Sequence, residues 1–288
     1  MKKWGFALIL CLGLTFVYMK PFAEPKVEIQ YGDYKNEKEE RWTTEEIQKE
    51  IKVEQIFQGN LLLVNSEHPV HQEGIITDIV ILSANNDLTK GYVLLGTDIY
   101  LSEEIAHQFS EMIAAAGKEG IQNFAITSGF RDFNEQSILF ENMGPDYALP
   151  PGYSEHNLGL SLDVGSTQMR MADAPEGRWI EENAWKYGFI LRYPKDKVGI
   201  TGIQYEPWHI RYVGFPHSAI MKEKNLVLEE YLEYLKKEEN ISASVNGERY
   251  EISYYPVTEN MTIPVPEDHY YEISGNNVDG VIVTVFSS

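Results

Sequence analysis

The chain has 288 residues, with 24 Lys and Arg against 44 Asp and Glu, so its formal net charge is −20. This balance excludes proteins that bind nucleic-acid phosphates, which need clustered positive side chains. Apolar residues form 43% of the chain, which is enough for a packed core and excludes disorder throughout. Cys11 is the one cysteine, so disulfide scaffolds, CxxC redox sites and thiolate-rich zinc fingers are excluded as well.

Residues 1–22 have the pattern of a membrane anchor or export signal. Lys2 and Lys3 precede an uncharged run over residues 4–19. The run is shorter than the ~20 residues that span a bilayer comfortably, but no A-x-A cleavage site follows it. An uncleaved anchor is therefore favoured over a cleaved signal. We expect a cell-membrane protein with its folded part on the extracytoplasmic side.

Residues 23–57 are charged and poor in apolar side chains. Such a segment cannot bury enough surface to order itself, so it is predicted to be an acidic tether. Within it, residues 43–46 (Thr-Thr-Glu-Glu) have the pattern of a helix start, and one short helix is expected there.

Residues 58–239 are predicted to form the main domain. Ser102 is a typical helix cap, followed by Glu103 and Glu104 and by apolar residues at helical spacing. Asp132 precedes a second predicted helix. Further on, the patterns predict strands at residues 124–127, 158–164, 189–193 and 205–213, and helices at 179–187 and 218–237. Helices mixed with short strands predict an α+β fold with a small, mostly antiparallel sheet flanked by helices.

Residues 240–288 are rich in Thr, Val, Ile and Tyr and are predicted to form a small β appendage. Asn246-Gly247 lies between two β-type runs, which is a strong signal for a hairpin with a two-residue turn.

The sequence lacks the motifs of several common catalytic mechanisms. No Ser is followed three residues later by Lys, and neither a G-x-S-x-G elbow nor a phosphate-binding loop occurs. No His is followed directly by Glu, so the helical His-Glu-x-x-His zinc motif is also missing. An enzyme with this sequence would depend on carboxylates, histidines or a metal.

Two short segments bring His, Asp and Glu together. A catalytic zinc takes three protein ligands and keeps one position open, and His156, Asp163 and His209 could supply the three. Glu206 lies close enough in sequence to move a proton to and from water. Each segment taken alone also has a structural explanation: a loop histidine with a strand-edge acid, or a turn with a packed Trp and a hydrogen-bonded histidine.

At these segments the chain resembles the zinc D,D-peptidases of bacterial cell-wall metabolism, whose fold is shared with hedgehog signalling domains. Four linked segments carry the resemblance, which covers roughly residues 58–216. They are residues 128–131 with Gln136, 152–159 with Asp163, 185–189, and 206–214. The anchor and the β appendage make the VanY-type D-alanyl-D-alanine carboxypeptidases of glycopeptide-resistant bacteria the most similar members.

The resemblance assigns a role to individual residues. It implies one zinc ion bound by His156, Asp163 and His209, with Glu206 as general base and acid. It implies that Arg131 stabilises the oxyanion, a role suited to a fixed guanidinium facing developing negative charge. It also implies substrate-binding residues, with Ser154 a candidate for the terminal carboxylate: Gln136, Ser154, Tyr153, Tyr193 and Trp208. For the three aromatic residues, core packing is an equally good explanation.

The function implied is removal of the C-terminal D-Ala from muramyl pentapeptide precursors of peptidoglycan. Two alternatives stay open. One is a related D,D-dipeptidase or L-alanyl-D-glutamate endopeptidase, and the other is a catalytically silent zinc-binding wall module. A dipeptidase needs an extra acid for the substrate's free ammonium, and an exported one would not meet a cytoplasmic dipeptide pool. A silent module needs neither Glu206 nor Arg131. These considerations favour the carboxypeptidase.

Overall fold

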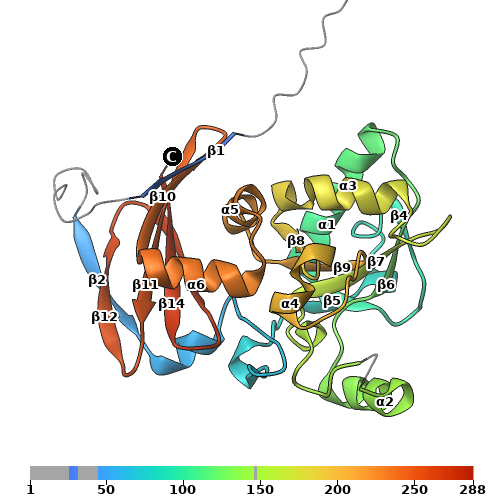
Figure 1. Ribbon diagram of the computed structural model, residues 1–288, viewed down its shortest axis with the longest axis horizontal. Helices are drawn as coiled ribbons and strands as arrows, with labels where there is room; N and C mark the ends of the chain where they lie inside the picture. The colour runs from blue at the N-terminus through green and yellow to red at the C-terminus, as the bar shows by residue number, and fades with distance from the viewer. Residues whose placement is uncertain (1–25, 32–44, 146–147, 288) are drawn as a thin grey trace, which may run out of the picture.

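The computed structural model describes residues 26–31, 45–145 and 148–287 (Figure 1). The anchor predicted for residues 1–22 lies outside these ranges. Within them, no helix combines the length and the apolar character needed to cross a membrane.

The segment predicted to form the main domain, here called the α+β domain, contains a five-stranded sheet with the order β4-β6-β7-β9-β8. The first pair, β4 and β6, is parallel, and the other pairs are antiparallel. The predicted α+β class with a mostly antiparallel sheet is confirmed. The strands are β4 (Tyr92–Leu94), β6 (Phe124–Ser128), β7 (Ser161–Ser166), β9 (His209–Tyr212) and β8 (Phe189–Leu191), and β3 (Ile79–Ile81) pairs separately with β5 (Tyr100–Ser102).

Helices α1 (Glu103–Lys118) and α3 (Pro175–Asn183) pack with this sheet around one apolar core. The α1 helix begins where predicted, because the Ser102 hydroxyl accepts a hydrogen bond from the Ile105 amide. The α2 helix (Phe133–Met143) begins after Asp132 and projects from the body of the domain, as Figure 1 shows. A short helix, α4 (Val198–Thr201), follows β8.

The single helix predicted for residues 218–237 is instead two, α5 (His217–Lys224) and α6 (Leu228–Glu238). Asn225 separates them in the left-handed region, with φ 51°. Asn tolerates that conformation better than most residues and so ends the first helix. The break lets α6 lie between the two parts of the molecule (Figure 1).

The second part, here called the β domain, has a five-stranded antiparallel sheet in the order β1-β10-β11-β14-β13 and a two-stranded sheet of β12 with β2. The Asn246-Gly247 turn is confirmed: it joins β10 to β11, and both residues have positive φ, 56° and 89°. The strands are β1 (Val27–Tyr31), β10 (Asn240–Val245), β11 (Glu248–Pro256), β14 (Gly280–Ser287), β13 (Tyr270–Gly275), β12 (Met261–Pro266) and β2 (Glu46–Ile51).

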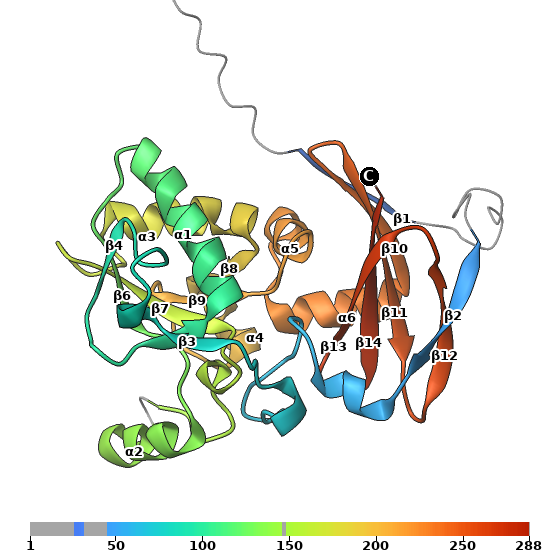
Figure 2. The same ribbon diagram turned by 180° about the vertical axis from the view of Figure 1, so that it is seen from behind.

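The tether expected for residues 23–57 differs from the structure where it is described. Strand β1 pairs with β10 and strand β2 pairs with β12, so Glu46 lies in a strand and not in the expected short helix. Seen from behind, β2 and β12 form the outer edge of the β domain (Figure 2). A segment with few apolar residues orders here because existing strand edges supply its hydrogen-bond partners and Ile51 enters the buried core.

One apolar cluster runs from the α+β domain through α6 into the β domain. Buried residues of the first sheet, of α6 and of the second sheet contact one another within it. The cluster includes Ile190 and Val213, then Tyr231 and Leu235, then Ile241 and Ile252. The two parts therefore share this apolar cluster as a common core at their junction.

Candidate metal centre and active site

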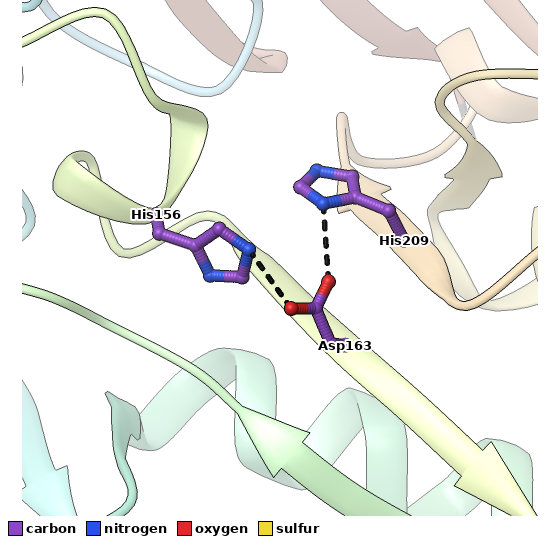
Figure 3. A group of neighbouring side chains, drawn as sticks. All are labelled: His156, Asp163 and His209. Atoms are coloured by element: carbon purple, nitrogen blue, oxygen red, sulfur yellow. Dashed lines mark ion pairs between the residues drawn. The ribbon is translucent and has the colours of Figure 1, made fainter. Parts of the chain in front are cut away.

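The three predicted metal ligands meet at one end of the central sheet. His156 lies in the short helix η4 (Glu155–Asn157), while Asp163 in β7 and His209 at the start of β9 are opposite each other in the strand register. Figure 3 shows both imidazoles directed at the Asp163 carboxylate. The separations are 3.4 Å from His156 Nε2 and 3.2 Å from His209 Nδ1. One ligand atom from each residue lies within 4.8 Å of the others.

Backbone contact fixes the orientation of His156. Its Nδ1–H donates to the carbonyl oxygen of Gly129 at 2.6 Å, since a carbonyl can only accept. Nε2 is thereby left with its lone pair toward Asp163. A metal-binding histidine is commonly held in this way by its second nitrogen.

Glu155 orients His209, and the sequence interpretation missed it. His209 Nε2–H donates to Glu155 Oε2 at 3.3 Å, which turns Nδ1 toward Asp163 and the other candidate ligands. The Glu155 side chain is fully buried and also receives Arg192 Nε at 2.8 Å and Arg211 Nη1 at 2.7 Å. The two arginines lower the pKa of the Glu155 carboxyl well below its usual value, against the opposing effect of burial.

The donor set fits a zinc ion. Asp163 Oδ1 is buried and forms no well-directed hydrogen bond among the described residues, although His209 Nδ1 lies 3.2 Å away, so a cation could satisfy this oxygen. Two imidazole nitrogens and one carboxylate are a common set for catalytic zinc, with room for a further ligand. The residues present therefore suit the metal.

Electrostatics at the centre favour a cation. Burial opposes ionisation of Asp163, but the two imidazoles hold the pKa of its carboxyl below the usual range. Burial also opposes the charge on His209, yet Asp163 and Glu155 raise the pKa of this imidazole to about 9. A metal that binds at Nδ1 must displace that proton, so metal binding releases protons to solvent near neutral pH.

Glu206 and Arg131 lie beside the three ligands. Glu206 Oε2 is 3.9 Å from His209 Nδ1, and burial raises the pKa of the Glu206 carboxyl. A raised pKa suits a group that accepts and then returns a proton. Burial lowers the pKa of Arg131, although the carboxylates of Asp163 and Glu206 oppose that effect. Its Nε is buried without a hydrogen-bond partner among the described residues.

The predicted substrate-binding residues differ in their placement. Gln136 is buried, with Nε2 donating to the Leu149 carbonyl and Oε1 unpaired among the described residues. Ser154 is buried next to η4, and Tyr153 before it is half-buried. The Tyr193 ring lies 5.0 Å from the His209 ring. Trp208 is the most open of the five, with 41% of its surface exposed.

Comparison with protein families gives a match over residues 98–215 to the model described as "VanY: D-alanyl-D-alanine carboxypeptidase". A D-alanyl-D-alanine carboxypeptidase of Enterococcus faecium is 62% identical over 99% of this chain and 97% of its own length. The bifunctional D-Ala-D-Ala dipeptidase and carboxypeptidase VanXYC of Enterococcus gallinarum is 34% identical over 62% of this chain and 95% of its own.

Two solved structures of vancomycin-resistance peptidases are also similar to this chain. The vancomycin-resistance D,D-dipeptidase VanXYg, in complex with a D-Ala-D-Ala phosphinate analogue, covers 84% of this chain and all of its own, with 30% identity and a TM-score of 0.73. A VanY mutant from a VanB-type resistance cassette, in complex with Zn(II), covers 60% of this chain and 98% of its own, with 28% identity and a TM-score of 0.50.

Proposed function

The chain belongs to the family of D-alanyl-D-alanine carboxypeptidases, and on that premise we propose that it is a zinc enzyme acting on peptidoglycan pentapeptide precursors that end in D-Ala-D-Ala. The reaction removes the last D-Ala and leaves a tetrapeptide. The observation that carries the proposal is the convergence of His156, Asp163 and His209 with Glu206 at one buried end of the sheet.

His156, Asp163 and His209 would hold the metal. Zinc in such a site supplies Lewis acidity toward a carbonyl and lowers the pKa of water toward about 7. The chain supplies the other functions. Glu206 takes a proton from the attacking water and delivers it to the leaving amine of D-Ala, a role that its raised pKa supports.

Arg131 is the group that faces developing negative charge. Its guanidinium is held close to Asp163 and Glu206, and its buried Nε has a donor to offer. A donor fixed before the reaction stabilises the transition state more than the ground state. Ser154 and Gln136 are proposed to hold the terminal carboxylate and the adjoining peptide, since both are buried polar side chains; Ser154 lies two residues before His156, and Gln136 Oε1 is unpaired among the described residues.

D,D-dipeptidase activity is the second candidate. It is favoured by the likeness to the D,D-dipeptidase VanXYg and to the bifunctional VanXYC. A dipeptide brings a free ammonium to the metal and therefore needs an additional acid in the pocket. A side-by-side rate comparison separates the two candidates.

The test uses the full chain in detergent, loaded with zinc. We expect release of D-Ala from UDP-muramyl-pentapeptide, loss of this activity on chelation, recovery with zinc, and no inhibition by benzylpenicillin, because no acyl-enzyme serine takes part. The same assay is run on the D-Ala-D-Ala dipeptide. A comparable rate on the dipeptide would replace the proposal by the second candidate, and no turnover of either substrate would refute both.

The enzyme is also proposed to contribute to glycopeptide resistance, since the reaction destroys the D-Ala-D-Ala terminus that glycopeptides bind. Residues 1–22 are proposed to anchor it in the cell membrane with the active site outside, on the support of Lys2, Lys3 and the uncharged run at 4–19. Cell fractionation tests this: the full chain should enter the membrane pellet, and a chain lacking residues 1–22 should not. A shortened soluble form of the full chain would show a cleaved signal.

A further inference from the structure

A carboxylate of helix α6 continues the network behind the metal site. Glu229 binds the Arg192 guanidinium in bidentate fashion, at 2.8 Å and 2.7 Å to Nη1 and Nη2. Arg192 Nε in turn donates to Glu155 Oε1, while Glu155 Oε2 accepts from His209. An unbroken chain of contacts thus joins α6 to a metal ligand.

The two arginines on Glu155 are held differently. Arg211 donates to three backbone carbonyls, those of Tyr212, Asn60 and Leu62, so the main chain fixes its position. Both terminal nitrogens of Arg192 donate to Glu229, and the Arg192 side chain is fully buried. The terminal nitrogens of Arg192 therefore depend on one acidic side chain, that of Glu229, which is only 16% exposed.

Charge balance depends on the same residue. Glu155 and Glu229 offset the charges of Arg192 and Arg211 in a largely buried region. Without Glu229, Arg192 would retain a buried charge and unpaired donors, which is unfavourable in a protein interior. Arg192 would then attract the Glu155 carboxylate more strongly. Glu155 would in consequence become a weaker hydrogen-bond acceptor for His209.

We infer that Glu229 is a positioning residue for the metal centre: through Arg192 and Glu155 it fixes the orientation of His209 and strengthens metal binding. The inference rests on the proposed metal site. Glu229 lies beyond the family match at residues 98–215, on a helix that also packs against the β domain (Figure 1). The β domain thereby helps to hold a residue on which the metal centre depends.

The test measures zinc affinity of the full chain by competition with a chromophoric chelator, with no peptide present. E229Q removes the charge and one of the two carboxylate oxygens, and we expect zinc affinity to fall about tenfold, at the low end of the range for residues behind metal ligands. The visible spectrum of the cobalt-loaded protein should change as well, because His209 shifts. E230Q is the matched control: it makes the same charge change on the same helix and weakens an ion pair with Lys197, yet has no link to Glu155.

A double-variant cycle locates the effect. In an E155Q background, E229Q should cause little further loss of zinc affinity, because the path to His209 is already broken. Equal losses in E229Q and E230Q, no loss in E229Q, or full additivity with E155Q would each overturn the inference. Failure of E229Q to fold while E230Q folds would do the same by revealing a general stabilising role. A parent chain that binds no zinc would instead refute the proposed function.

Discussion

At the scale of single residues, the Glu206 carboxyl is the proposed general base and acid. It is close to His209 but is not needed to hold the metal, and burial raises its pKa. E206Q should therefore lower kcat by about 10²- to 10⁴-fold, the contribution of a general acid–base group, while zinc content stays that of the parent. Steady-state assays with metal analysis check this.

Glu181, an exposed acid on α3, offers the control. E181Q should retain the parent rate, because the Glu181 side chain has no role in the proposed chemistry. Full activity of zinc-loaded E206Q would contradict the mechanism.

Sequence patterns could locate the candidate metal ligands but not the residues that orient them. Four motif segments in a fixed order identified His156, Asp163 and His209, and the structure brings these together. Glu155 could not be predicted from the sequence, because it is next to His156 in the chain but its side chain contacts His209, which lies in strand β9. Arg192 and Glu229 carry no motif of their own; only the packing of β8 and α6 brings their charges together.

Among the secondary-structure elements, local signals gave the best predictions. The Ser102 cap and the Asn246-Gly247 turn were predicted from a few adjacent residues. The N-terminal segment was not, because Ile51 and its neighbours order only by pairing with strands from the other end of the chain. Composition indicates whether a segment can fold by itself. Strands β1 and β2 cannot, and they become ordered only by pairing with β10 and β12.

The hairpin turn allows a test at this scale. Gly247 has φ 89°, a conformation that side chains disfavour, so G247A should lower the free energy of unfolding by about 1 kcal/mol. The matched control is G117A in helix α1, where a Cβ would meet no atom within 4 Å. That change should raise stability by up to about 1 kcal/mol, since Ala favours helix. Urea unfolding monitored by circular dichroism measures both, and equal effects would argue against the turn geometry.

For the molecule as a whole, His217 connects three elements across the shared core. Its ring lies 2.7 Å from the Tyr231 hydroxyl of α6 and 2.9 Å from the Thr284 hydroxyl of β14. Burial lowers the pKa of His217 to about 3, from an ordinary value of 6.5. Between these values the unfolded chain binds a proton that the folded chain does not, so stability falls as pH drops from 6.5 toward 3.

H217Q should remove this contribution, making the slope of unfolding free energy against pH shallower by about 1.4 kcal/mol per unit in that window. Comparison of slopes by urea unfolding remains valid even where the variant is less stable overall. H107Q, on the exposed face of α1, is the control for loss of a histidine as such. An unchanged slope in H217Q would show that this imidazole takes up a proton in the folded state.

The pairing of the first strands with the last ones also sets the order in which the molecule can form. Val27 pairs with Val245, and Glu46 pairs with Pro266. A ribosome delivers the N-terminal strands first, so they stay without partners until nearly the whole chain has been made. Contacts between such distant positions form slowly. The β domain must therefore form late, beside an α+β domain whose residues have all been made before its last strands (Figure 1).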